Sequence, residues 1–191
     1  VIVSLSLMFN ACHNNENTTE NKTHTSAADT SHLFTLLPPA STHVDFNNPL
    51  TEGLNTNVLL YEYFYNGGGV AVGDVNNDGL QDLYFSSNLG DNKLYLNKGG
   101  MQFQDITVAA NVQSRPGPWK TGVTMVDVNG DGKTDIYVCY SGKMPAEKRA
   151  NQLFINLGND ATGTPKFAEQ AKEYNLADTG YSTQAYFFDF D

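Results

Sequence analysis

The chain has 191 residues, 40% of them hydrophobic, so it can bury the core of one or two ordinary domains. It carries 21 acidic residues against 11 Lys and Arg, a formal net charge of −10 at pH 7. Nucleic-acid binding requires clustered basic side chains that neutralise phosphates, so this charge argues against a nucleic-acid partner. All four histidines lie at or before His43, so the remainder has no imidazole for a Ser/His or Cys/His mechanism.

The first residues have the features of an export signal. The apolar run from Val1 to Phe9 has the length of a signal-peptide h-region and is too short to span a bilayer, so residues 1–11 are interpreted as that region. Ala11 precedes Cys12, and a small residue before a cysteine at this place resembles a lipobox, in which the cysteine becomes lipid-modified. The alternative is that residues 1–12 form a buried strand. We predict lipid attachment at Cys12, with the membrane contacted only through this anchor.

The location that follows is the outer membrane or the cell surface, as a lipoprotein. Secretion and a periplasmic location are the alternatives. Residues 13–32 are polar and contain no aromatic or large aliphatic side chain, so they cannot bury enough surface to offset the entropy of ordering. We therefore predict that residues 12–44 comprise the lipid-attached cysteine and a disordered tether, and that residues 45–191 form the folded region.

The folded region contains internal repeats. The segment GVAVGDVNNDGLQDLYF (69–85) matches GVTMVDVNGDGKTDIYV (122–138), and YFFDFD (186–191) begins a third copy. The segment NKLYLN (92–97) likewise matches NQLFIN (151–156). The repeats are therefore residues 69–121, residues 122–182 and a truncated 183–191.

Each complete repeat predicts four short strands bounded by turn residues. The expected strands are 69–74, 82–86, 93–97 and 102–106 in the first repeat, and 122–127, 135–140, 152–156 and 166–168 in the second. Only residues 168–175 predict helix, as one or two turns. Four antiparallel strands in roughly 50 to 60 residues are typical of a propeller blade.

The predicted fold is all-β, a partial β-propeller with about two complete four-stranded antiparallel blades and the start of a third. Fewer than three blades cannot close a ring, so we expect the sequence to be a fragment of a longer protein. Trp119 and Tyr181 align before their respective loop strands and are expected to pack between neighbouring blades rather than to bind a ligand. Cys139 is expected to be a small buried side chain and not a nucleophile.

Both complete repeats contain a nine-residue loop of the pattern Asp-x-Asn-x-Asp-Gly-x-x-Asp, and calcium takes six to eight oxygens that such a loop can supply from alternate positions. The candidate ligands of the first loop are Asp74, Asn76, Asp78, the main-chain carbonyl of Leu80, and Asp82. Those of the second loop are Asp127, Asn129, Asp131, the main-chain carbonyl of Lys133, and Asp135. We predict two complete structural calcium sites.

The sixth loop position is Gly79 or Gly132, where the sharp turn favours a residue without Cβ. In the third copy, Asp189 and Asp191 match only the first and third ligand positions, so that metal loop is incomplete.

The loop does not fit two other calcium-binding motifs. An EF-hand requires flanking helices and a bidentate Glu at position twelve, where this chain has Phe85 or Val138. Nonapeptide calcium repeats recur every nine residues, which these loops do not. Magnesium is less favoured than calcium because it keeps its waters. A single motif of this kind is also compatible with a polar hairpin turn, but its repetition in register favours metal binding.

At these residues the chain resembles the FG-GAP/VCBS repeats of integrin α-subunit propellers and of many secreted bacterial proteins. The run YFYNGGGVAVGDVNNDGLQDLYF (63–85), followed by NKLYLNKGGMQFQDIT (92–107), is similar to VCBS-repeat lipoproteins of Bacteroidetes-type bacteria. Some of those proteins also carry a C-terminal ASPIC/UnbV domain. The resemblance implies a seven-bladed-type propeller in which calcium stiffens the loop between two strands of a blade, with the ten ligand positions named above.

Two functional hypotheses from different classes follow. The first is a non-enzymatic, exported calcium-binding repeat protein that presents a propeller surface to a protein or glycan, as in adhesion. The alternative is a hydrolase in which the propeller is a scaffold for acidic catalytic residues. Nearly all the clustered carboxylates already have a predicted metal role, so the sequence favours binding and assigns no catalytic residue.

Overall fold

The computed structural model describes residues 33–117 and 119–190. The chain divides into two units, Val1–Leu36 and Leu37–Asp191, and the helices and strands of the described residues belong to the second. The predictions for the signal region, the lipid attachment at Cys12 and the tether up to residue 32 lie outside the described residues. Within the described part of the chain, no helix has the length and apolar character needed to cross a membrane.

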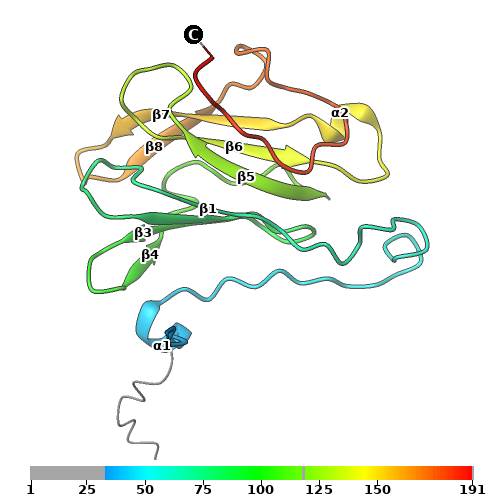
Figure 1. Cartoon of the computed structure of the whole chain (residues 1–191), viewed down its shortest axis with the longest axis horizontal. Helices are drawn as coiled ribbons and strands as arrows, with labels where there is room; N and C mark the ends of the chain where they lie inside the picture. The colour runs from blue at the N-terminus through cyan, green and yellow to red at the C-terminus, as the bar shows by residue number, and fades with distance from the viewer. Residues whose placement is uncertain (1–32, 118, 191) are drawn as a thin grey trace, which may run out of the picture. The chain divides into compact units, whose positions relative to one another are not determined.

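The second unit contains two four-stranded antiparallel sheets, each with its strands in chain order (Figure 1). The first sheet consists of β1 (Val70–Gly73), β2 (Asp82–Phe85), β3 (Lys93–Asn97) and β4 (Phe103–Asp105). The second consists of β5 (Lys120–Val126), β6 (Asp135–Tyr140), β7 (Gln152–Asn159) and β8 (Pro165–Glu169). The predicted all-β class and the four strands per repeat are confirmed.

In the part of the chain that the structure describes, helix is confined to two single turns, α1 (Pro39–Thr42) and α2 (Ala146–Arg149). The helical prediction for residues 168–175 is wrong at its start, because Ala168 pairs with Ile155 in β7 and belongs to β8. The segment after β8 forms overlapping hydrogen-bonded turns, in which the Tyr174 N–H donates to the Gln170 carbonyl at 3.2 Å and the Leu176 N–H donates to the Ala171 carbonyl at 2.8 Å.

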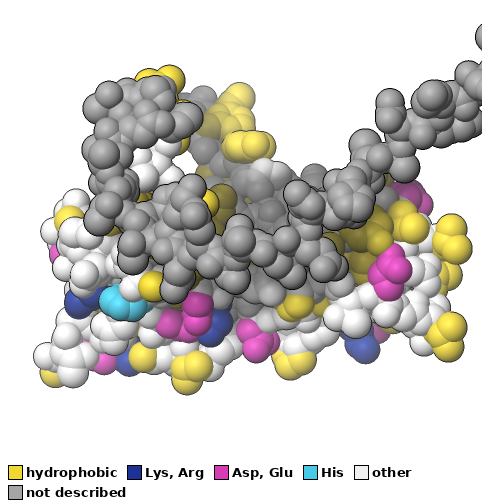
Figure 2. Space-filling model, turned by 90° about the horizontal axis from the view of Figure 1, so that it is seen from below, with side chains coloured by type: hydrophobic (Ala, Val, Ile, Leu, Met, Phe, Trp, Pro, Cys, Tyr) yellow, Lys and Arg dark blue, Asp and Glu magenta, His cyan; other side chains and the backbone are white. Residues whose placement is uncertain are grey.

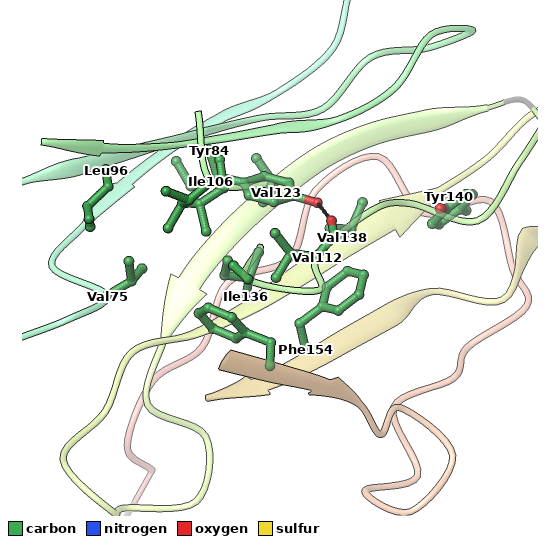
Figure 3. Packing of buried hydrophobic residues seen from close by; sticks show 14 residues of the cluster. Val75, Tyr84, Leu96, Ile106, Val112, Val123, Ile136, Val138, Tyr140 and Phe154 are labelled. Atoms are coloured by element: carbon green, nitrogen blue, oxygen red, sulfur yellow. Dashed lines mark hydrogen bonds between the residues drawn. The ribbon is translucent and has the colours of Figure 1, made fainter. Parts of the chain in front are cut away.

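The main core lies between the two sheets (Figure 3). Alternate residues of each strand point to the same face, so Tyr84 and its partner Leu94 share the inner face of the first sheet. Ile136 and its partner Phe154 do the same in the second sheet. The Tyr84 hydroxyl is buried here and donates to the Val112 carbonyl at 3.0 Å. Burial of this apolar surface holds the two repeats together.

The opposite face of the second sheet forms a smaller core. Its strand residues are Tyr137, Cys139, Leu153 and Ile155, covered by side chains of residues 171–177 and 185–187. Cys139 is 1% exposed, and burial raises the pKa of its thiol to about 11. The prediction that Cys139 is a small buried side chain is confirmed.

The opposite face of the first sheet is partly covered by residues 45–48. Phe46 stacks on Phe85 with ring centroids 4.8 Å apart. The Tyr95 hydroxyl donates to Asp45 at 2.7 Å, and Asn48 donates from its amide to Asn88 at 2.8 Å. The start of the folded region therefore packs as part of the first repeat.

The two aligned aromatic residues have different environments. Trp119 is 4% exposed and packs against Tyr61 and Phe64, with ring centroids 5.2 and 5.3 Å away. Tyr181 is 65% exposed, with the Arg149 guanidinium 4.3 Å from its ring centroid. Trp119 is therefore packed as expected, but against residues 61–64, which precede the first repeat, rather than between the two repeats. Tyr181 is not packed.

Lys120, the first residue of β5, is a buried charge outside the predicted sites. Its side chain is 1% exposed, and its ammonium donates to the Gly117 carbonyl at 3.0 Å. Burial lowers the pKa of Lys120 to about 8 from its usual 10.5, against the opposing effect of Asp91. A lysine whose pKa falls on folding destabilises the folded state at pH values below its folded-state pKa. This penalty disappears as the pH rises to the pKa that the lysine has in the unfolded chain.

Replacement of Lys120 by methionine is therefore expected to raise the free energy of unfolding at pH 7. Its advantage over the wild type should shrink between pH 8 and 10.5, by up to about 1.4 kcal/mol per pH unit. Urea unfolding of both proteins across this range measures the difference. A difference that does not change with pH would contradict the assignment of a buried, pKa-shifted Lys120.

Candidate metal centre

The two predicted metal loops connect the first two strands of their sheets. Gly73 at the end of β1 pairs with Asp82 at the start of β2, and Val126 pairs with Asp135 in the same way. In each loop, the residue before the first position thus pairs with the residue at the ninth position. The hairpin geometry brings the two ends of the nine-residue motif together.

Within the first loop, side-chain oxygens accept hydrogen bonds from the loop's own N–H groups. The Asp78 N–H is shared between Asp74 Oδ1 at 3.2 Å and Asn76 Oδ1 at 3.3 Å. The Gly79 N–H donates to Asp74 Oδ2 at 2.7 Å, and the Leu80 N–H donates to Asp78 Oδ1 at 2.8 Å. Oxygens from the first and third positions therefore converge on one amide.

The second loop repeats this arrangement atom for atom. The Asp131 N–H is shared between Asp127 Oδ1 at 3.2 Å and Asn129 Oδ1 at 3.0 Å. The Gly132 N–H donates to Asp127 Oδ2 at 2.8 Å, and the Lys133 N–H donates to Asp131 Oδ1 at 2.9 Å. Equivalent donors and acceptors in two separate sheets indicate one local structure formed twice.

Backbone conformation explains the glycine at the sixth position. Gly79 has φ of 84° and Gly132 has φ of 79°, in the left-handed region where a Cβ is disfavoured. This expectation is confirmed. The fourth position is also left-handed, with φ of 59° at Asn77 and 72° at Gly130, which the motif did not reveal.

The aspartate at the ninth position is buried in both loops. Asp82 accepts from the Val75 N–H at 2.9 Å through Oδ2 and from the Asn97 N–H at 2.7 Å through Oδ1. Asp135 makes the equivalent bonds, from the Val128 N–H at 3.1 Å and the Asn156 N–H at 2.7 Å. These carboxylates connect each loop to the third strand of its own sheet, since Asn97 ends β3 and Asn156 lies in β7.

Charge accumulates in each loop. Burial, and to a smaller extent the carboxylates of Asp78 and Asp74, raise the pKa of Asp82 to about 6 despite two backbone hydrogen bonds that lower it. Burial likewise raises the pKa of Asp135, and Asp131 and Asp127 add to the effect. The electrostatic consequence is an unfavourable concentration of negative charge, which a cation would relieve.

The oxygen donors of these loops suit calcium by their chemistry. Each loop offers three carboxylates, one amide oxygen and one main-chain carbonyl, and carboxylate oxygens that accept one N–H retain further lone pairs. The ninth-position carboxylate is nevertheless turned toward backbone N–H groups. Among residues 33–117 and 119–190, no group of three or more His, Cys, Asp or Glu side chains is close enough to hold a metal ion. Asp189 is exposed, and Asp191 lies outside the described residues.

The loops differ at the seventh position. In the second loop the Lys133 ammonium lies 2.8 Å from Asp131 Oδ2, whereas the first loop has the apolar Leu80 at this place. The Lys133 hydrogen bond lowers the pKa of Asp131. A cation binding in the second loop would therefore compete with this ammonium for the Asp131 carboxylate.

An open pocket of about 820 Å³ was not anticipated from the motifs, and none of the ten predicted ligand residues lines it. Its aromatic lining consists of Tyr61, Tyr63, Trp119 and Tyr181, with Thr183 and Gln184 among the polar residues. The aromatic residues that align before each loop strand were the sequence signal for it. On the face shown in Figure 2, Lys and Arg side chains are interspersed with Asp and Glu and do not form one basic patch.

Comparison with known proteins gives one family match, over the segment that contains both loops, and two relatives. A family model described as FG-GAP-like repeat matches residues 74–138, which contain both nine-residue loops. Cartilage acidic protein 1 from Xenopus tropicalis is 38% identical over 73 residues, and the protein of that name from Homo sapiens is 37% identical over 73 residues. Each alignment covers 38% of this chain and 11% of the relative. Residues 74–138 of this all-β structure are thus similar to FG-GAP-like repeats, and the chain spans only about a tenth of the length of these relatives.

Proposed function

We propose that this chain is part of a non-enzymatic, calcium-stabilised β-propeller scaffold that presents a surface for binding a protein or a glycan. The observation that carries the proposal is the repetition of one loop structure. The first and third loop positions, Asp74 with Asn76 and Asp127 with Asn129, direct their oxygens to equivalent amides in both sheets. The FG-GAP-like match over the same residues supports it.

Calcium has a structural role in this proposal. The ion would be held by the oxygens of the first, third, fifth and ninth positions and by the carbonyl of the seventh. It would neutralise the carboxylates that crowd each loop and fix the turn between the first two strands. Because the ninth-position aspartates Asp82 and Asp135 are hydrogen-bonded to the third strand of each sheet, an ordered loop would also stabilise the sheet behind it.

A calcium titration of the 191-residue chain tests this proposal. Two equivalents are expected to bind, with affinities on the order of 10⁻⁴ to 10⁻³ M. Asp74→Ala should remove one equivalent and Asp127→Ala the other, because each removes a first-position ligand. Asp91→Ala is the matched control, since it removes an exposed carboxylate outside both loops and should leave two equivalents. Absence of binding at millimolar calcium would refute the calcium role.

The proposed partner surface includes the pocket lined by Tyr61, Tyr63 and Tyr181. Exposed aromatic rings beside amide and hydroxyl groups can contact either a sugar ring or a peptide. Binding of the chain to immobilised glycans and peptides, compared with the Tyr63→Ala variant, measures this role. Binding that is equal in both proteins would exclude the pocket as the partner surface.

A further inference from the structure

Three asparagine side chains connect the first loop to the second repeat. The Asn77 amide donates to the Gly132 carbonyl, in the second loop, at 3.1 Å. The Asn159 amide donates to the Asn76 carbonyl at 2.9 Å, and the Asn156 amide donates to the Val75 carbonyl at 2.8 Å. Two of these acceptors, on Val75 and Asn76, are adjacent residues of the first loop.

Asn156 joins the two loops through a single residue. Its side chain is 1% exposed, and its N–H donates to Asp135 Oδ1 at 2.7 Å while its amide reaches Val75 of the other loop. The same amide also lies 3.1 Å from the Thr134 carbonyl of its own loop. One buried residue therefore contacts both the ninth-position carboxylate of the second loop and the backbone of the first loop.

Asn97 is the equivalent of Asn156 in the first repeat. Comparison of the two shows which hydrogen bond is specific to the contact between repeats. Asn97 donates its N–H to Asp82 Oδ1 at 2.7 Å and its amide to the Gln81 carbonyl at 2.9 Å. Asn156 makes both equivalent bonds and, in addition, the bond to Val75. The asparagine at this position thus donates two hydrogen bonds to its own loop. Asn156 donates a further one to the loop of the preceding repeat.

We propose that the two loops bind calcium cooperatively, so that an ion in either loop raises the affinity of the other through the amides of Asn77, Asn156 and Asn159. This inference rests on the calcium sites of the proposed function. A loop that orders around an ion loses conformational freedom, and a neighbour bonded to it loses part of the same freedom at that step. Binding of the second ion then carries a smaller entropic cost of ordering its loop.

The coupling must be reciprocal, because each ion changes the affinity of the other by the same factor. The expected factor is about five, the lower end of the usual range for coupled sites, because the bonds of Asn77 and Asn159 are exposed to water. Asn77→Gly and Asn159→Ala remove these two bonds at exposed positions. Glycine suits the left-handed backbone of Asn77 and is already present at the equivalent Gly130.

Calcium titrations of the full chain, followed by NMR, test the proposal with each loop observed separately. The backbone amides of Gly79 and Gly132 report the occupancy of the first and second loop. Asp127→Asn inactivates the second loop and is expected to weaken calcium binding at Gly79 by about five-fold. In the Asn77→Gly/Asn159→Ala background the same inactivation should weaken it by less than about two-fold.

Comparison of the two backgrounds removes the direct effect of the lost Asp127 charge, which is common to both. Asn175→Gly is the matched control, because Asn175 is an exposed asparagine with φ of 56° outside the loops, and it should retain the five-fold effect. An equal effect of Asp127→Asn in both backgrounds, or no effect in either, would overturn the inference while leaving the two calcium sites intact. Calcium that shifts neither glycine signal in the wild type would instead refute the proposed function on which it rests.

Discussion

Replacement of Phe154 by alanine is expected to lower the free energy of unfolding by about 3–5 kcal/mol. Phe154 is 2% exposed, pairs with Ile136 across β6 and β7, and packs in the core between the two sheets. Alanine would remove the ring and leave a cavity, because the surrounding strands are held in register and cannot collapse onto it. Urea unfolding of the two proteins measures the loss.

The control for this change lies on the same strand. Leu157 in β7 is 60% exposed, so Leu157→Ala should alter the free energy of unfolding by no more than about 0.5 kcal/mol. Fluorescence of Trp119, which lies next to β5, and far-ultraviolet circular dichroism should give the same transition for each variant. A Phe154→Ala protein with separate transitions by the two probes would show that the sheets unfold independently, contrary to a shared core.

Replacement of Asp82 by alanine is expected to lower the free energy of unfolding by about 1–3 kcal/mol without any calcium present. The change leaves the N–H groups of Val75 and Asn97 without their acceptor in a buried place. Each unsatisfied donor costs about 1–3 kcal/mol, and the relief of removing a carboxylate whose pKa is raised to about 6 offsets part of this cost. Denaturation in the presence of a calcium chelator measures this structural contribution separately from any metal.

Asp74→Ala separates the structural role from the metal role. The Asp74 carboxylate accepts from loop N–H groups that lie at the surface, where water can replace it, so its loss should change the calcium-free stability by less than about 1 kcal/mol. It should nevertheless abolish calcium binding in the first loop. If Asp74→Ala and Asp82→Ala destabilise the calcium-free protein equally, the distinction between a surface ligand and a buried anchor is wrong.

The sequence predicted those parts of the structure that depend on local pattern. Short runs of β-branched and aromatic residues bounded by turn residues placed Tyr84 and Leu94 in successive strands, and the two copies of the motif predicted where each hairpin turns. The left-handed backbone at Gly79 and Gly132 followed from the motif as well, because only glycine is free of a Cβ penalty there. These features arise within a few residues of one another along the chain.

The remaining features depend on contacts between distant residues. Nothing local to Asp45 indicates that it accepts the Tyr95 hydroxyl, 50 residues further on. The bond from Asn156 to Val75 spans 81 residues, and its residue type alone suggests only a strand end or a turn. The burial of Asp82 and Asp135 could likewise not be predicted. The motif identifies an acidic residue at the ninth position but not the N–H groups that this residue faces.

Thermal unfolding of the 191-residue chain with and without calcium tests the central claim most directly. At about 10 mM calcium, affinities on the order of 10⁻⁴ to 10⁻³ M predict about 1.4–2.7 kcal/mol of stabilisation per occupied loop. For a domain of this size, two such loops should raise the unfolding temperature by at least about 5 °C, and magnesium should raise it less. The Asp74→Ala/Asp127→Ala variant should show no calcium-dependent rise. An unfolding temperature of the wild type that calcium leaves unchanged, or that rises equally in the double variant, would contradict a calcium-stabilised scaffold.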